Sequence, residues 1–129
     1  MTEPKPHEQY KVKPKRSKYA NVKVELDGYT FDSKGEAARY EELRLLERAG
    51  EISSLRIHTR WELQPGWRDE DGKKWRAITY ESDFDYVEGD KFVVEDFKGV
   101  KTQVFKLKAK MFRYTYPEFI FRITEAKND

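Results

Sequence analysis

Apolar and polar residues alternate along this chain first with the period of a strand and then with the period of a helix. Residues 22–31 alternate on both sides of an Asp-Gly pair, which favours the tight turn of a small hairpin. Residues 33–49 carry apolar side chains at helical spacing, with Ser33 suited to cap the start and Gly50 placed to end the helix. The first part of the chain therefore predicts a hairpin followed by a helix.

The middle of the chain predicts a second, longer hairpin. Residues 55–63 are predicted to form one strand, because apolar side chains alternate there, and residues 74–86 are predicted to form the long return strand. We expect Trp67 and Trp75 to pack across this hairpin; the alternative is that they stack on nucleic-acid bases. His58 has an arginine two positions away on either side and is expected at the surface.

A third hairpin, a second helix and a last strand complete the pattern. Residues 84–94 predict a hairpin that turns at a Glu-Gly-Asp cluster. Thr102 is placed to cap a helix that runs to about residue 114, and residues 119–123 predict a final buried strand. The apolar side of this helix consists of Val104, Phe105, Leu107, Met111 and Phe112. Strands and helices mixed in this way predict an α/β chain of the α+β kind.

Composition narrows the classes of protein that remain. The 129 residues suit one domain, and 39% of them are charged against 37% hydrophobic, so a strongly charged surface must enclose a modest core. Cysteine is absent, which excludes a disulfide scaffold and a cysteine-based zinc site and fits a reducing compartment. The sequence has neither a run as apolar and long as a membrane helix nor a signal peptide, so we expect a cytoplasmic protein without a membrane partner.

Basic residues gather in two regions, although the net charge is only +2. Residues 1–20 lack an apolar period, which predicts a flexible basic arm in front of a single domain at residues 21–129. In this arm Lys13, Lys15 and Arg16 are candidates to track phosphates; a solvated tail is the alternative. The second helix and its approach carry a stripe without acidic partners, which favours phosphate binding over a solubility face. Its members are Lys101, Gln103, Lys106, Lys110 and Arg113.

Two acids and a lysine are predicted to share one patch of the sheet. Side chains alternate along a strand, so Asp96 and Lys98 point the same way, and Asp83 should lie beside them on the neighbouring strand. Two close carboxylates repel unless a cation lies between them, and Mg²⁺ or Mn²⁺ prefers such oxygen ligands. This chemistry points to metal-assisted hydrolysis of a phosphodiester. A solvated face with weak cross-strand ion pairs is the alternative.

Glu36 lies one helical turn before Tyr40, on the stripe of the first helix that must face the sheet. An acid in that position is expected near the edge of the core. The alternative is that Glu36 completes a capping box with Ser33. The two roles conflict in part, because a capping carboxylate has less freedom to bind a metal.

Four segments occur in order along the chain, namely FDSKGEAARYEEL, ITYESDFDY, VVEDFKG and KTQVFKLKAKMF. With an acid in the first helix, an acid on one strand and acid-x-Lys on the next, they resemble the PD-(D/E)xK nuclease superfamily. The chain looks closest to a small phage-encoded group that is linked to Holliday junction resolvases. The resemblance covers about residues 22–123. It implies the restriction-endonuclease-like fold, which is a mixed central sheet flanked by helices.

The resemblance also implies a role for each site residue. Asp83 and Asp96 would bind the divalent metal, and Lys98 would position the attacking water or stabilise the phosphate. Glu36 would complete the metal shell or act through a water. Gln103, on the helix after the lysine, would touch the substrate.

The chain departs from the superfamily pattern at two positions. Ser82 stands where a proline often precedes the first strand acid, and Asp96 is shorter than the commoner glutamate, so distances to the metal would differ. Asp85 shares a face with Asp83 and is held in reserve as a ligand. Strand alternation turns Glu95 away from Asp96, so Glu95 is left out of the site.

The function implied is that of a Mg²⁺-dependent endodeoxyribonuclease, with Mn²⁺ as the second choice, which cuts branched DNA such as Holliday junctions in DNA recombination and repair. Such resolvases act as homodimers, because paired nicks need two sites related by symmetry. If phage-encoded, the protein would work in the host cytoplasm. The alternatives are an endonuclease of the same fold with another DNA substrate, of the restriction or transposon-end type, and a non-catalytic DNA-binding module.

Overall fold

The computed structural model of this chain describes residues 22–125, and the chain divides into two compact units, Met1–Ala37 and Ala38–Asp129. The predicted basic arm, with its three candidate phosphate contacts Lys13, Lys15 and Arg16, lies outside the described residues.

The first unit holds the predicted small hairpin. Strands β1 (Val24–Leu26) and β2 (Tyr29–Phe31) pair antiparallel, and the two residues between them have the positive φ angles of a type I′ turn, 54° at Asp27 and 84° at Gly28. Helix α1 (Lys34–Arg48) begins in this unit and continues in the second. The hairpin and the start of the helix are therefore confirmed.

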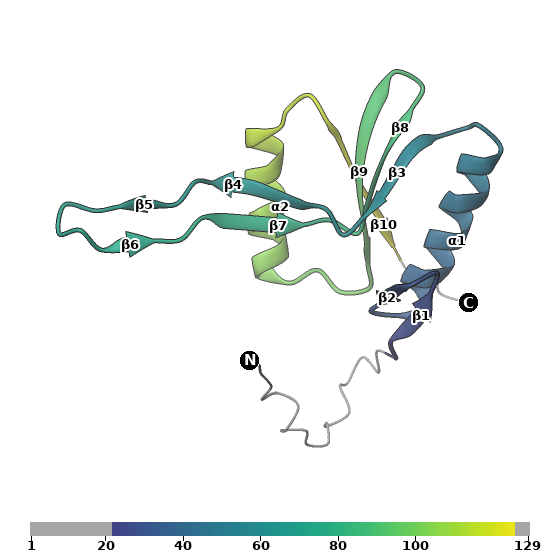
Figure 1. The fold of residues 1–129 in the computed structure, drawn as a ribbon, viewed down its shortest axis with the longest axis horizontal. Coiled ribbons are helices and arrows are strands. Elements are labelled where there is room, and N and C mark those ends of the chain that lie inside the picture. Colours follow the sequence, from purple (N-terminus) through teal and green to yellow (C-terminus); the bar gives the residue numbers. More distant parts are fainter. Residues whose placement is uncertain (1–21, 126–129) are drawn as a thin grey trace. The chain divides into compact units, whose positions relative to one another are not determined.

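The second unit is built on a mixed sheet of four strands in the order β10-β9-β8-β3 (Figure 1). Its strands are β3 (Ser53–Ile57), β8 (Phe84–Glu88), β9 (Lys91–Lys98) and β10 (Ile120–Glu125). Neighbours pair antiparallel except that β10 runs parallel to β9, which it reaches through helix α2 (Gln103–Thr115). The predicted α+β class, with a mixed sheet flanked by helices, is confirmed.

Helix α2 packs on the sheet through a narrow apolar stripe. Phe105, Ala109 and Phe112 are buried against Val94 of β9. The start is capped as predicted, because the Thr102 side chain accepts a hydrogen bond of 3.0 Å from the amide of Phe105. The apolar side predicted for this helix was wider than the stripe that is buried, however.

Two members of that predicted side face solvent. Val104 is 62% exposed and Leu107 is 56% exposed. Each residue of a helix turns about 100°, so positions 105, 109 and 112 already fill the face that meets the sheet.

The opposite face of the sheet is held to α1 by a buried ion pair. Arg39 donates from Nε to Glu95 Oε2 at 2.6 Å and from Nη2 to Oε1 at 3.0 Å. The hydroxyls of Tyr86 and Thr124 donate to the same carboxylate. Burial alone would raise the pKa of Glu95, but the hydrogen bonds from Arg39 and Tyr86 outweigh it and hold the pKa below its ordinary value. The prediction that Glu95 faces away from Asp96 is confirmed.

Both long strands of the predicted middle hairpin are interrupted, so their continuity was predicted wrongly. The first divides into β3 and β4 (Arg60–Gln64) at His58, whose φ of 58° is left-handed. The second divides into β6 (Lys74–Trp75), β7 (Ile78–Glu81) and β8. The alternation of apolar and polar residues continues across both breaks. Alternation alone therefore does not reveal the point where the chain leaves one sheet and joins another.

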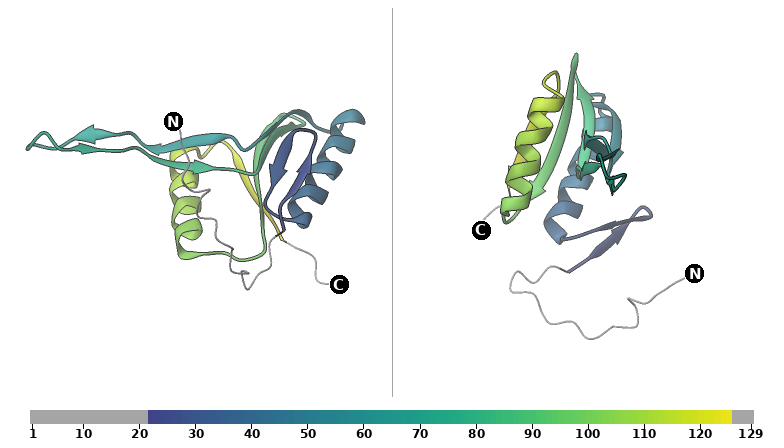
Figure 2. Two further views of the ribbon diagram at one scale, coloured as in Figure 1. Left: turned by 60° about the horizontal axis from the view of Figure 1, so that its bottom comes forward. Right: turned by 90° about the vertical axis from the view of Figure 1, so that its left-hand side faces the viewer.

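The segments between those breaks form a two-stranded ribbon of their own. β4 pairs with β7, and β5 (Trp67–Arg68) pairs with β6, both antiparallel. Figures 1 and 2 show this ribbon projecting from the second unit, with α2 beside its base. Trp67 and Trp75 stack across it with ring centroids 6.0 Å apart, so their predicted packing is confirmed.

Within residues 22–125, no helix has the length and apolar character required to cross a membrane.

Replacing Glu95 with glutamine is expected to lower the free energy of unfolding by about 3 kcal/mol at neutral pH, because Arg39 would lose its charged partner in a buried position. A depressed pKa contributes stability above the ordinary carboxyl pKa of 4.5, and that contribution is lost as pH falls through the folded-state value. Denaturant unfolding at a series of pH values should therefore give two stability curves that converge toward low pH.

The matched control is Glu42→Gln, which removes the other carboxylate bonded to Arg39, at 3.0 Å on the exposed surface. That change should cost less than about 1 kcal/mol. Equal losses in the two variants would contradict a special role for the buried pair.

Candidate functional site

Two carboxylates meet where β8 begins and β9 ends. The strand register places Phe84 opposite Glu95, so the next residues, Asp83 and Asp96, are brought side by side. The amide of Asp83 donates to Asp96 Oδ1 at 2.9 Å, and the amide of Phe97 donates to Asp83 Oδ2 at 2.7 Å. The predicted meeting of these two acids is confirmed.

The lysine of the acid-x-Lys motif lies on the same face. Lys98 Nζ is 3.5 Å from Asp96 Oδ2 and 4.6 Å from the centroid of the Phe105 ring. The Asp96 side chain is 1% exposed and the Lys98 side chain is 28% exposed, so the ammonium lies between the buried acid and solvent. The structure thus brings together Asp83, Asp96 and Lys98 as predicted.

Asp96 is buried but only partly satisfied. Among the described residues, its Oδ2 atom is enclosed without a hydrogen bond of good geometry. Burial raises the pKa of Asp96 above its ordinary value, and the positive charge of Lys98 opposes this only in part. This oxygen has Lys98 Nζ at 3.5 Å and could accept a further cation, and two carboxylates are the donor set of a hard divalent metal, so the residues fit a metal centre.

A tyrosine that was not predicted as a site residue interacts with the same carboxylate. Tyr80 lies on β7, and its buried hydroxyl likewise lacks a hydrogen bond of good geometry within residues 22–125. Burial, then the charge of Asp96, raises the pKa of Tyr80 far above its ordinary value, so this hydroxyl stays protonated. No local signal distinguishes Tyr80 from a core tyrosine.

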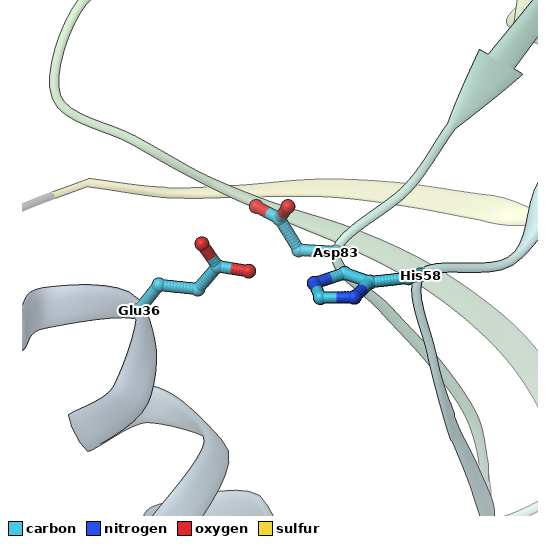
Figure 3. A group of neighbouring side chains, drawn as sticks. All are labelled: Glu36, His58 and Asp83. Carbon is cyan, nitrogen blue, oxygen red and sulfur yellow. The ribbon is translucent and has the colours of Figure 1, made fainter. Parts of the chain in front are cut away.

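His58 was also missed, because it was predicted at the surface. It is half-buried, and its ring nitrogen lies within 4.8 Å of a carboxylate oxygen of Asp83 (Figure 3). Its amide donates to the carbonyl of Asp83 at 3.0 Å. The signal that could have found it is a histidine next to a strand end, since histidine tolerates the left-handed backbone that such a turn requires.

Glu36 is a helix-capping residue in the first unit, at the start of α1 (Figure 3). It is 4% exposed, and its amide donates to Ser33 Oγ at 3.1 Å. Its carboxylate accepts from the amide of Asp32 at 3.2 Å, one residue before the predicted partner Ser33. The capping alternative is therefore present, and the predicted metal role stays a prediction.

Asp85, the reserve ligand, already has strong partners. Arg56 donates to it from Nε at 2.8 Å, and the Thr59 hydroxyl donates at 2.5 Å. These bonds tie β8 to β3 and to the turn that follows it, so Asp85 has a structural role.

The predicted basic stripe is exposed along α2. Gln103, Lys106, Lys110 and Arg113 are all exposed, and the guanidinium of Arg113 covers the ring of Phe121 at 4.8 Å. The fifth member differs from the prediction, because Lys101 pairs with Glu125 at 2.5 Å. An acid near the end of β10 therefore neutralises this lysine.

Comparison with known proteins gives a family without a described activity. No curated protein and no solved structure matches the chain. A family model matches residues 16–127, which is most of the chain. The chain therefore belongs to the family described as "Protein of unknown function (DUF1064)".

Proposed function

We propose that this protein is a metal-dependent endodeoxyribonuclease whose site is formed by Asp83, Asp96 and Lys98. The observation that carries the proposal is the buried Oδ2 atom of Asp96, which lacks a hydrogen bond of good geometry and lies beside a second carboxylate and a lysine. A purely structural acid in that position would be satisfied by donors, as Glu95 is on the other face of the same strand.

Asp83 and Asp96 would hold the metal, with His58 as a third ligand and Glu36 as a fourth, directly or through a water. When bound, the metal supplies Lewis acidity to the scissile phosphate and to the attacking water. An imidazole ligand favours transition metals over Mg²⁺, so Mn²⁺ is as good a candidate as Mg²⁺.

Two further groups have defined parts in this proposal. Lys98 is held between Asp96 and the Phe105 ring, and a fixed ammonium stabilises the charge that develops on the phosphate. The hydroxyl of Tyr80 stays protonated and interacts with the Asp96 carboxylate, and it would help to orient that carboxylate.

DNA would be held by the exposed basic side of α2, through Gln103, Lys106, Lys110 and Arg113. We propose branched DNA, such as a four-way junction, as the substrate, cut by a homodimer with two symmetry-related sites. Two alternatives stay open. One is an endonuclease of the same fold with a restriction or transposon-end substrate. The other is a non-catalytic DNA-binding module, which the basic side of α2 would support even without the carboxylates.

Cleavage of a synthetic four-way junction is the primary test. With Mg²⁺ or Mn²⁺ we expect symmetric nicks in the junction and none in a linear duplex of the same sequence, and EDTA should abolish them. Asp96→Ala should lower the rate by on the order of 100- to 1,000-fold while junction binding persists, because it removes a metal ligand. The measurement is product formation on denaturing gels.

The matched control is Asp90→Ala, which removes an exposed acid in the turn between β8 and β9 and should cut normally. Equal cutting of both DNAs would support nuclease activity but contradict the proposed preference for junctions. Binding without cutting in either metal would leave the DNA-binding module.

Asp96→Asn is expected to melt at a higher temperature than the native protein in EDTA at neutral pH. The amide removes a buried charge whose folded-state pKa is raised, yet its oxygen can still accept from the Asp83 amide. Below the ordinary carboxyl pKa of 3.8 the native group is protonated in both states, so the difference should vanish. Added Mn²⁺ should raise the melting temperature of the native protein alone.

Asp85→Asn serves as the comparison for that melting experiment. This carboxylate is already bonded by Arg56 and Thr59, so its loss should lower the melting temperature. If Asp96→Asn also melts lower in EDTA, the idea of an unsatisfied metal ligand is wrong.

Binding of Mn²⁺, followed by the electron paramagnetic resonance signal of the free ion, separates the two remaining ligands. His58→Asn should weaken Mn²⁺ binding more than Mg²⁺ binding, because only the imidazole favours the transition metal. Glu36→Gln retains an oxygen for the Asp32 amide and so preserves the cap while removing the charge. Unchanged Mn²⁺ affinity in Glu36→Gln would restrict Glu36 to capping.

A further inference from the structure

The outer part of the ribbon is an ordered structure without a hydrophobic core. We call residues 64–77 the ribbon tip; it contains β5 and β6 (Figures 1 and 2). Its turn is organised by Asp69, which accepts from the amides of Asp71 at 3.0 Å and Lys73 at 2.9 Å and from the Trp75 indole at 3.0 Å. Arg68 adds a bond of 3.0 Å to the carbonyl of Gly72. The turn of the tip is therefore held by its own hydrogen bonds.

Its two tryptophans are stacked but exposed. Trp67 is 51% exposed and Trp75 is 41% exposed, with an angle of 20° between their rings. The ammonium of Lys73 lies 4.2 Å from the centroid of the Trp75 ring. Within residues 22–125 the Trp67 ring stacks only on Trp75, and half of the residue is exposed, so this ring offers an aromatic platform.

The charges around this platform suit a polyanion better than a protein. Residues 68–76 contain four basic and three acidic side chains, and one of the acids, Asp69, is occupied by its three donors. Seven charged side chains in nine residues would be unusual at the centre of a protein–protein interface, where charged residues are depleted. An aromatic platform bordered by arginine and lysine is typical of surfaces on which unpaired bases stack.

We propose that the ribbon tip binds unpaired or splayed DNA bases, with Trp67 as the stacking platform. This inference rests on the proposed function, because a DNA branch point is where such bases become available. Arg68, Lys74 and Arg76 would contact the adjacent phosphates. The tip thus assigns recognition of the branch to a part of the chain separate from the carboxylates.

The experiment measures binding of the full chain in EDTA, so that no cleavage is required. The DNA probes are a four-way junction with 2-aminopurine at the branch point and the linear duplex of the same sequence. Native protein should change the 2-aminopurine fluorescence of the junction. Trp67→Ala should abolish that change and weaken junction binding about tenfold, while duplex binding stays unchanged.

Two variants test whether the ring itself is responsible. Trp67→Phe keeps an aromatic face and should retain most of the fluorescence change. Leu45→Ala, which truncates a side chain of α1 that is 59% exposed, should behave as the native protein. Trp67→Ala is not expected to unfold the chain, because the ring contributes to no core, and its melting curve checks this.

Three results would overturn the inference. They are an unchanged 2-aminopurine signal with native protein, an equal loss of junction and duplex binding in Trp67→Ala, and a fall in molecular mass of Trp67→Ala by light scattering. The last would assign the tip to a second copy of the chain. Base stacking without any cleavage would contradict the proposed nuclease activity and support base binding by the ribbon tip. Cleavage without stacking would contradict only base binding by the ribbon tip.

Discussion

The pairing of β8 with β9 is the constraint on which both faces of the second unit depend. Once Phe84 lies opposite Glu95, alternation along β9 directs Glu95 toward α1 and Asp96 toward the side covered by α2. Two neighbouring carboxylates are thereby buried on opposite faces of one strand. A slip of one residue in this register would exchange the two faces, so the ion pair and the candidate site form together or not at all.

The two carboxylates meet opposite surroundings although both are buried. Glu95 is 0% exposed and Asp96 is 1% exposed, so burial penalises both charges. Donors from Arg39 and Tyr86 bring the pKa of Glu95 below its ordinary value, whereas burial keeps the pKa of Asp96 raised, because the charge of Lys98 offsets burial only in part. A charge kept buried without full compensation costs stability, and proteins retain such groups where they serve a function. Glu95 therefore serves stability, and Asp96 serves the chemistry we propose.

Short-range patterns predict the hairpins, both helices and the meeting of Asp83 with Asp96, because turn chemistry and alternation depend only on neighbouring residues. They do not predict His58 or Tyr80 as site residues. His58 lies where the chain passes from the sheet to the ribbon, and Tyr80 lies near the end of β7, just before the chain returns to the sheet. The point at which a chain changes sheets is decided by packing between distant segments. The apolar side of α2 was predicted too wide for the same reason, because packing against the sheet decides which positions of the helix are buried.

The ribbon begins next to the carboxylates of the candidate site. The amide of Ser82 donates to the carbonyl of Thr59 at 3.0 Å, next to the bond from the amide of His58 to the carbonyl of Asp83. Strands β4 and β7 therefore leave the four-stranded sheet at the candidate site. Trp61 fixes the start of the ribbon. Its indole donates to Ser82 Oγ at 3.0 Å, and its ring packs edge-on against that of Phe112, with ring centroids 5.5 Å apart. A base held at the ribbon tip and a phosphate held beside Lys98 would therefore be joined through the two strand pairs of the ribbon, β4 with β7 and β5 with β6. If the chain is the nuclease we propose, the length of the ribbon would then set the distance between the branch point and the cut.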